Sequence, residues 1–304
     1  MHHGFLSVPR VNLGDMKRPE PCDEQEELAW AAGFFDGEGC FTYTRAGGFA
    51  SVAMVQTRQE PLERFRKAVG TGSVTGPYDC RSPTRPTKQE QYQFHAYGFN
   101  PMWRIAGLLW PHLGSIKCRQ ALAVLARSAK ELPFAPTPAS RCPPNGSLSR
   151  PGAREHLAWA AGFLEGDGSF SYSTSARAMF VSFTQRDREV LDRFRRTVGF
   201  GKIYGPYRHR PGRALSIKPF YQFRVNGFEK VQAIAAMLWF KLGSAKRIQA
   251  SRVLQRWPRE CHRGHPLTTG HSGCGRCTAD YWESLRLTAG QGQRLVGTEL
   301  KPRL

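Results

Sequence analysis

The sequence predicts an α+β protein made of two copies of one structural unit. Residues 28–125 align with residues 157–254 without a gap, and roughly two in five aligned positions are identical. Within each copy, segments of helical periodicity are interleaved with segments in which apolar and polar residues alternate as in strands. Their order is helix, two strands, helix, two strands and one or two closing helices. Each unit is therefore expected to contain a four-stranded sheet.

The elements of the first unit are predicted as follows. EQEELAWAAGFFDG is a helix with Asp23 as its expected N-cap, and CFTYTR and FASVAMVQT are strands. LERFRKAVG is a short helix that ends at its glycine. GSVTGPY and YQFHAYG predict the remaining strands, and residues 102–129 predict the closing helices. The second unit repeats this order in REHLAWAAGFLEG, SFSYST, AMFVSFTQ, LDRFRRTVG, GKIYGPY, YQFRVNG and the helices that follow.

Composition predicts where these units begin and end. A segment rich in Pro, Ser and Gly separates them and is typical of a linker, whereas both ends of the chain lack periodicity and are expected to be flexible. The predicted boundaries are 1–22 for the N-terminal segment, 23–130 for the first unit, 131–152 for the linker, 153–257 for the second unit, 258–285 for a metal-binding module and 286–304 for the tail.

The charge of the chain indicates a polyanionic partner. Its formal net charge is +20, which disfavours a compact state unless an anion such as nucleic acid is bound. No apolar run is long enough to span a membrane, and the N-terminal residues lack the pattern of a secretory signal. Five of the eight cysteines are isolated from one another, which favours a reducing, intracellular setting. We expect a cytoplasmic protein without a membrane partner, with an organelle as the open alternative.

The first helix of each unit carries small residues on one face. Ala29, Ala32 and Gly33 share a face, as do their counterparts in the second copy, so two such helices could pack with their backbones close together. Such packing would bring Glu38 and Asp167 side by side. The simpler interpretation is an ordinary core face with solvated acids at the helix end. However, both copies place acids at the same two positions although the helix dipole disfavours them there, which favours a divalent cation as their partner.

The segments AAGFFDGEG and AAGFLEGDG resemble the nine-residue signature of the LAGLIDADG homing endonucleases. The duplication resembles the single-chain members of that family, which carry two copies of the motif, and the likeness covers about residues 25–257. It implies two pseudo-symmetric αββαββα repeats whose motif helices form the interface and whose sheets form a saddle over the DNA major groove. It also implies a monomeric, divalent-metal-dependent endonuclease that cuts both strands of a long, asymmetric double-stranded DNA target, as in intron homing.

The same resemblance implies a role for individual residues. The acids at the eighth motif position, Glu38 and Asp167, would bind the catalytic Mg²⁺ or Mn²⁺, with the preceding Gly37 and Gly166 at the same metal site. Asp36 and Glu165, at the sixth position, would be structural hydrogen-bonding acids. Two further pairs would complete the catalytic centres: Gln56 and Gln185 at strand ends, and Lys117 and Lys246 ahead of the last helices.

The strand surfaces differ between the copies, although the motif before them is nearly unchanged. Between positions 44 and 58 only Val52 and Gln56 recur in the second copy, so the two sheets are expected to read different half-sites. The predicted DNA-binding residues are Thr42, Thr44, Arg45, Arg58, Arg81, Arg85, Lys88, His95, Ser171, Ser173, Arg177, Arg186, Arg208, Arg210, Arg213, Lys218 and Arg224.

The C-terminal segment CHRGHPLTTGHSGCGRC contains a candidate zinc site. Cys261, His265, Cys274 and Cys277 provide a C-x₃-H and a C-x₂-C arrangement, which suits a tetrahedral structural Zn²⁺ where there is too little apolar material for a core. His262 and His271 are alternative ligands, and a basic tail with incidental cysteines is the alternative to a site. The segment also resembles a zinc-binding module appended to phage and mobile-element nucleases.

Two hypotheses about the function therefore remain. The first is a site-specific double-strand DNA endonuclease. The second is a binding protein of the same fold, either an RNA maturase with intron RNA as its partner or a DNA-binding regulator without catalysis. The intact acids Glu38 and Asp167 favour cleavage, because a degenerate motif would lose these ligands. Cleavage does not exclude maturase activity, since both can coexist in one chain.

Overall fold

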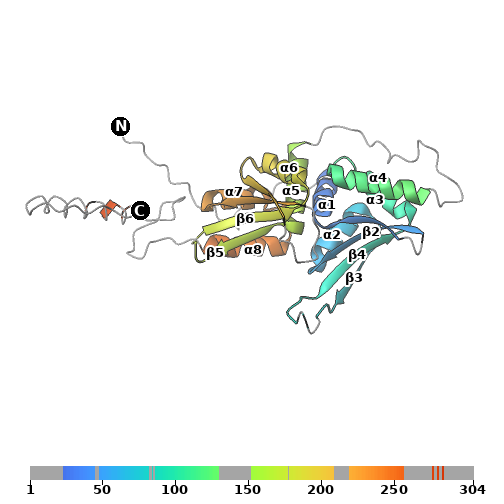
Figure 1. The fold of residues 1–304 in the computed structure, drawn as a ribbon, viewed down its shortest axis with the longest axis horizontal. Coiled ribbons are helices and arrows are strands. Elements are labelled where there is room, and N and C mark those ends of the chain that lie inside the picture. The colour runs from blue at the N-terminus through green and yellow to red at the C-terminus, as the bar shows by residue number, and fades with distance from the viewer. Residues whose placement is uncertain are drawn as a thin grey trace, which may run out of the picture.

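The computed structural model has two halves that repeat one arrangement of helices and strands. It describes residues 23–44, 48–81, 84, 86–129, 152–176, 178–208 and 219–256, together with residues 276, 279, 280 and 283. Figure 1 shows the halves side by side, meeting at the first helix of each. The first half contains α1 (Glu24–Glu38), β1 (Cys40–Thr44), β2 (Phe49–Gln56), α2 (Gln59–Val69), β3 (Ser73–Tyr78), β4 (Gln91–Tyr97), α3 (Phe99–Leu109) and α4 (Ser115–Ala129).

The second half has the same elements in the same order, as the sequence predicts. Its strands and helices are α5 (Ala153–Asp167), β5 (Ser169–Ser173), β6 (Ala178–Gln185), α6 (Arg188–Val198), β7 (Lys202–Tyr207), β8 (Phe220–Asn226), α7 (Phe228–Leu238) and α8 (Ser244–Gln255). The predicted α+β class with two four-stranded sheets is confirmed. Among the described helices, none combines the length and apolarity that crossing a membrane requires.

Local sequence signals account for the ends of several helices. The Asp23 side chain accepts a hydrogen bond of 2.7 Å from the backbone N–H of Glu26, which is the predicted N-cap of α1. Helices α2 and α6 end at Gly70 and Gly199, whose positive φ angles of 65° and 85° favour glycine over residues with a Cβ. The predicted glycine stops of these two helices are therefore confirmed.

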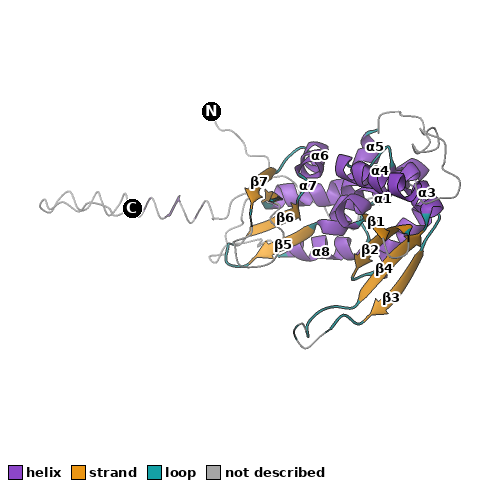
Figure 2. Ribbon diagram, turned by 45° about the vertical axis from the view of Figure 1, so that its right-hand side comes forward, coloured by secondary structure: helices purple, strands orange, loops and turns teal. Residues whose placement is uncertain are grey.

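Both sheets are antiparallel and share one topology. The strand order is β1-β2-β4-β3 in the first sheet and β5-β6-β8-β7 in the second. Successive strand residues point to opposite faces of a sheet. Helices cover one face of each sheet, and the other face points outward. Figure 2 shows the first sheet below α1, α3 and α4. Buried aromatic residues of both halves, including Phe94 and Phe223, belong to one continuous core cluster.

Charged residues also connect the two halves. Glu26, in the first turn of α1, is buried and forms ion pairs with Arg154 and Lys241 of the second half. Two cations therefore offset the cost of burying this carboxylate at the interface. The Ser244 hydroxyl of the second half likewise donates to Glu60, and the Ser115 hydroxyl of the first half donates to Glu189.

Candidate active site

Helices α1 and α5 approach each other as closely as two backbones can. A Cβ built on Gly33 would lie 2.0 Å from the carbonyl oxygen of Trp159, and one on Gly162 would lie 1.9 Å from that of Trp30. Real side-chain atoms do not approach a carbonyl oxygen this closely, so only glycine allows the observed packing. The predicted contact between the small faces of the two helices is confirmed.

This packing brings the acids at the eighth motif position together. Glu38 ends α1 and Asp167 ends α5. A Cβ on Gly37 would lie 3.1 Å from Oδ2 of Asp167, and one on Gly166 would lie 3.1 Å from Cγ of Glu38. Each acid thus lies against the glycine that precedes the other acid. The four predicted metal-site residues form one cluster at the interface.

The surroundings of the two carboxylates disfavour their negative charge. Burial, together with the neighbouring charge of Asp167, raises the pKa of Glu38 to about 7. Burial also raises the pKa of Asp167. Amide hydrogen bonds oppose both shifts, because Gln56 binds Glu38 and the Gln185 amide donates to Oδ2 of Asp167. Two acids held together at this electrostatic cost are typical of a site that binds a cation.

Two buried lysines lie beside the acids. Lys117 donates to the carbonyl oxygen of Gly39, and Lys246 donates to that of Gly168. These glycines directly follow Glu38 and Asp167, so each ammonium group is fixed next to one motif. Burial lowers the pKa of both lysines, whereas the nearby carboxylates oppose that shift. The six residues predicted to be catalytic are therefore gathered at the ends of α1 and α5.

The acid pair fits a hard divalent ion such as Mg²⁺. Mg²⁺ is commonly held by one or two carboxylates and keeps several waters, with substrate phosphates as further ligands. Glu38 and Asp167 supply such carboxylates, and the absence of a Cβ at Gly37 and Gly166 lets the two acids approach each other's helix. In the part of the chain that the structure describes, no cluster of three or more His, Cys, Asp or Glu side chains could hold a metal. The remaining ligands would therefore be amide or backbone oxygens, water or substrate.

The acids at the sixth motif position make the structural hydrogen bonds that the resemblance implies. Asp36 is buried and accepts hydrogen bonds from the backbone N–H of Gly114 at 2.9 and 3.0 Å and from the Trp159 indole at 2.9 Å. Glu165 accepts a hydrogen bond of 2.8 Å from the backbone N–H of Gly243. Among the described residues the buried Trp30 indole nitrogen has no hydrogen-bond partner, so the exchange of Asp for Glu makes the two sides unequal.

This difference predicts unequal effects of two matched substitutions. Trp159→Phe removes a donor to the buried Asp36 and is expected to lower the free energy of unfolding by about 1–3 kcal/mol more than Trp30→Phe. Each substitution reduces the ring volume by the same amount and weakens the same kind of cation–π contact, with Arg193 at 3.9 Å or Arg64 at 4.0 Å. Urea unfolding of both variants measures the difference. Equal destabilisation would show that the indole–Asp36 hydrogen bond contributes nothing.

Sequence reasoning missed two arginines that connect the halves. Arg64 lies over the Trp30 ring and donates to the carbonyl oxygen of Lys241 at 2.6 Å. Arg193, at the equivalent position, lies over the Trp159 ring and donates to the backbone carbonyl oxygen of His112 at 2.5 Å. Both arginines recur in the self-alignment, as LERFR and LDRFR, and this recurrence is the signal that could have identified them.

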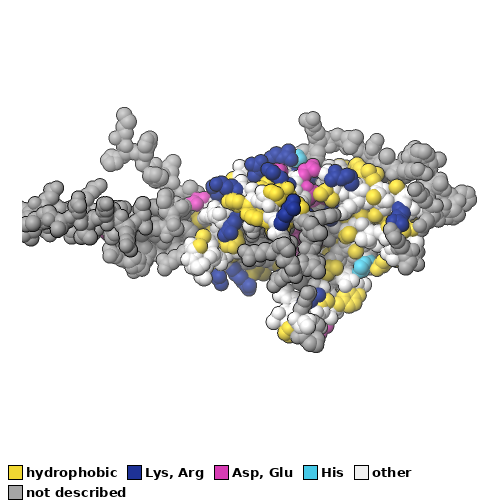
Figure 3. Space-filling model, in the orientation of Figure 1, with side chains coloured by type: hydrophobic (Ala, Val, Ile, Leu, Met, Phe, Trp, Pro, Cys, Tyr) yellow, Lys and Arg dark blue, Asp and Glu magenta, His cyan; other side chains and the backbone are white. Residues whose placement is uncertain are grey.

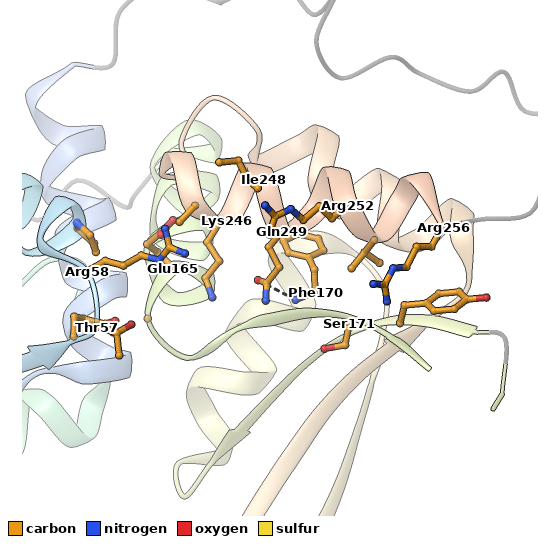
Figure 4. A pocket seen from close by; sticks show the side chains of 16 residues that line it. Thr57, Arg58, Glu165, Phe170, Ser171, Lys246, Ile248, Gln249, Arg252 and Arg256 are labelled. Carbon is orange, nitrogen blue, oxygen red and sulfur yellow. Dashed lines mark hydrogen bonds between the residues drawn. The ribbon is translucent and has the colours of Figure 1, made fainter. Parts of the chain in front are cut away.

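Two cavities flank the acid cluster, and each is lined by residues of both halves. The first has a volume of about 850 Å³ and contains Gln56 from β2 and Lys246 from α8 (Figure 4). The second has a volume of about 670 Å³ and contains Lys117 from α4 and Gln185 from β6. Each cavity therefore combines the lysine of one half with the glutamine of the other. We call them the α8 cavity and the α4 cavity.

The structure places the predicted DNA-binding residues in several locations. Those on the outward sheet faces are Thr42, Thr44, His95, Ser171, Ser173 and Arg224. Arg58 and Arg186 follow the ends of β2 and β6, Arg208 follows β7 and Lys88 precedes β4, whereas Arg81 pairs with Asp79 at 2.9 Å. Outside the described residues lie Arg45, Arg85, Arg177, Arg210, Arg213, Lys218, the predicted zinc ligands Cys261, His265, Cys274 and Cys277, and the alternatives His262 and His271.

The raised pKa of Glu38 predicts a pH-dependent stability when divalent ions are absent. Its pKa of about 7 in the folded chain exceeds its ordinary value of 4.5, so the folded state holds the proton more tightly. This contribution is complete below pH 4.5 and is lost as the pH rises through 7. Glu38→Gln should therefore match the parent at low pH and exceed its free energy of unfolding by about 1–3 kcal/mol at pH 8.

Thermal unfolding in a chelator at several pH values tests this prediction. Glu24→Gln, which removes an exposed carboxylate at the start of the same helix, is the matched control for the loss of one negative charge. A gain in the free energy of unfolding at pH 8 that is larger for Glu38→Gln than for this control would report the burial of Glu38. A Glu38→Gln variant that gains nothing over the parent at pH 8 would contradict the assigned burial of this acid.

Comparisons with known proteins yield structural likenesses alone. No protein-family model and no curated protein matches the chain. The LAGLIDADG meganuclease I-AabMI bound to uncleaved DNA is 16% identical, with 76% of this chain and 90% of that chain covered and a TM-score of 0.47. The LAGLIDADG homing endonuclease I-LtrWI bound to target DNA is 14% identical, with 78% and 99% covered and a TM-score of 0.39. Such likenesses carry no conclusion about function, which has to come from the site.

Proposed function

We propose that this protein is a divalent-metal-dependent, site-specific DNA endonuclease that cuts both strands of an asymmetric target. One observation carries the proposal. Two acids, Glu38 and Asp167, lie together at the ends of two helices in backbone contact, and each has its own glutamine and buried lysine. A nuclease that cuts both strands across a narrow groove needs two centres this close together. Each pseudo-symmetric half supplies one acid, one glutamine and one lysine.

The residues of each centre suit phosphodiester hydrolysis. A bound Mg²⁺ would supply Lewis-acid chemistry, by making a water more acidic and stabilising charge on the leaving oxygen. The Gln56 and Gln185 amides hold the carboxylates in place and can orient a water beside them. Lys117 and Lys246 place fixed positive charge where negative charge develops on the phosphate, in surroundings that strengthen the interaction.

The sheet faces support an asymmetric target. On the face toward the helices the second half repeats most residues of the first, including Phe41 as Phe170 and Val52 as Val181. On the outward face most residues differ, even at directly paired positions. The cross-strand pair Ser73 and His95 of the first sheet corresponds to the pair Lys202 and Arg224 of the second.

The pair Lys202 and Arg224 itself favours a DNA partner. Like charges directly opposite each other destabilise a sheet, so their presence on an outward face is expected to serve an electron-rich ligand. Arg224 is held over the Phe180 ring at 4.1 Å and donates to the Asn226 side chain at 2.9 Å, which limits its freedom. Arginine held in this manner suits the acceptor edge of guanine in the major groove. We infer that the two half-sites have different sequences.

The proposal is tested by selecting cleaved molecules from a randomised double-stranded DNA library in the presence of Mg²⁺. We expect one asymmetric sequence to be enriched among molecules cut on both strands. The same selection with the double variant Glu38→Gln/Asp167→Asn should enrich nothing by cleavage, whereas selection for binding should still recover that sequence. Enrichment by binding but not by cleavage with the parent protein would instead identify a DNA-binding protein without nuclease activity.

A further inference from the structure

The two cavities beside the acids differ in charge although their lysines and glutamines are equivalent. The α8 cavity is lined by Arg58, Lys246, Arg252 and Arg256, with Glu165 as its acid. The α4 cavity is lined by Lys117 and Arg186, with the acids Asp36 and Asp187. The first cavity is therefore positively charged overall, whereas cations and acids are balanced in the second.

Two substitutions between the copies add positive charge to the α8 side. The self-alignment that pairs the motifs also pairs Arg58 with Asp187, which reverses the charge, and Arg252 with Ala123, which removes it. Two exchanges act in the opposite direction, because Thr57 aligns with Arg186 and Ile248 with Arg119, whereas Arg256 has Arg127 as its counterpart. Arg58 precedes α2, whereas Asp187 caps α6 by accepting a hydrogen bond of 2.8 Å from the backbone N–H of Glu189. Arg58 and Asp187 therefore occupy equivalent places, each as the N-cap of the second helix of its half.

The arginines of the α8 cavity are accessible to a ligand. Arg58, Arg252 and Arg256 are exposed, and none of them forms a salt bridge within the described parts of the chain. Arg256 lies over the Tyr172 ring at 6.0 Å, which leaves its charge available. Figure 4 shows Lys246 and Arg256 extending from α8 toward β5, and Arg58 reaching in from the first half. In the view of Figure 3, Lys and Arg side chains also gather over the second half. Several unpaired cations around one open cavity favour a ligand with several negative charges.

The spacing of these cations suits a nucleic-acid strand. Lys246, Gln249, Arg252 and Arg256 recur at intervals of three to four residues, so they follow one side of α8. At 1.5 Å of rise per residue, the ten steps from Lys246 to Arg256 span roughly 15 Å, which is several nucleotides of a DNA strand. Lys246 would lie at the reacting phosphate, and the two arginines would contact phosphates farther along the same strand.

We propose that the α8 cavity holds the DNA strand that is cut first, and that the strand in the α4 cavity is cut second from a nicked intermediate. This inference rests on the proposed function and adds an order to its two cuts. The α8 cavity adjoins Gln56 and Gly166, and thereby Glu38, whereas the α4 cavity adjoins Gln185 and Gly37, and thereby Asp167. Additional cations stabilise the charge that develops in the transition state and fix the position of the strand.

Strand-resolved cleavage under single-turnover conditions tests this order. The selected target carries a different fluorophore on each strand, and the enzyme is in excess at a concentration that saturates the DNA. The parent protein should accumulate a molecule nicked in one strand. Arg252→Ala, which gives α8 the residue found at the equivalent position of α4, should slow the faster cut by about tenfold, as expected for the loss of one charge-assisted contact. The slower cut should change little.

The reciprocal variant makes the test independent of general effects on folding or affinity. Ala123 is exposed, so Ala123→Arg adds a cation to the α4 side without disturbing the core and should accelerate the slower cut several-fold. Asp187→Asn removes the acid, keeps the helix cap and should act in the same direction. Arg196→Ala removes an exposed charge from α6 outside both cavities and should leave the ratio of the two rates unchanged.

Each outcome decides one of the two proposals. Equal rates of cutting on both strands by the parent, or an Arg252→Ala variant that slows both strands equally or slows the slower strand, would overturn the order and leave the endonuclease intact. Failure of the parent protein to cut any selected DNA would overturn the proposed function and the order with it.

Discussion

Replacing Gly162 by alanine is expected to separate α1 from α5 and to lower the free energy of unfolding by more than about 3 kcal/mol. The added Cβ would lie 1.9 Å from the carbonyl oxygen of Trp30 and 2.9 Å from the backbone nitrogen of Phe34. These neighbours are backbone atoms, so no side-chain rotation can relieve the overlap. The helices would have to move apart, which would also separate Glu38 from Asp167. Gly33→Ala should destabilise the protein in the same way, because its Cβ would lie 2.0 Å from the carbonyl oxygen of Trp159.

Urea unfolding, together with cleavage of the selected target, measures both consequences. Gly152→Ala is the matched control, since Gly152 precedes α5 with a φ of −72°, and the nearest atom to its added Cβ is 3.9 Å away. That variant should remain within about 1 kcal/mol of the parent, because alanine is a poorer N-cap than glycine. A Gly162→Ala variant as stable as this control would mean that the two helices do not pack as described.

Much of the fold follows from sequence because the signals are local and occur twice. Alternating residues predict the strands, glycines mark the ends of α2 and α6, and the small residues of LAWAAGF indicate a close helix contact. Recurrence strengthens each signal, since one fold has to accommodate both copies. The places of Glu38 and Asp167 follow from the same pattern, because two helices packed by equivalent faces bring equivalent ends together.

The contacts between the halves could not be derived in this manner. Arg64 donates to a carbonyl oxygen of the loop before α8, and Ser244, the first residue of α8, donates to Glu60. Neither contact has a local sequence signal, because each depends on the loops of one half reaching the helices of the other. The charge difference between the two cavities could not be predicted either. The self-alignment shows the exchanges at Arg58 and Arg252, but only the structure shows that these two residues line one cavity.

Replacing Glu38 by glutamine or Asp167 by asparagine is expected to reduce cleavage by a factor of 10³ or more while DNA binding is retained. The amide keeps the size of the side chain but removes the charge that a divalent ion requires. Cleavage of labelled DNA and a binding titration in Ca²⁺ measure the two properties separately. We expect each single variant to lose cutting of at least one strand. Cleavage at the parent rate by both variants would show that these acids do not hold the catalytic ion.

The acids at the sixth motif position allow an effect on cleavage to be distinguished from an effect on the stability of the fold. Asp36→Asn leaves Glu38 untouched, but it weakens a buried acceptor for the Gly114 backbone N–H and the Trp159 indole. Burial raises the pKa of Asp36 from 3.8 to about 6, so the folded state holds the proton more tightly and the parent loses stability as the pH rises through 6. We therefore expect Asp36→Asn to lower the free energy of unfolding by about 1–3 kcal/mol at low pH, where the acid is protonated, and by less at pH 8. Glu38→Gln should instead match the parent at low pH, stabilise the metal-free protein at pH 8 and abolish cleavage. Urea unfolding at low pH and at pH 8, together with the cleavage rates of both variants, tests this contrast. If Asp36→Asn left stability unchanged and removed cleavage, the sixth-position acid would belong to the catalytic centre rather than to the helix interface.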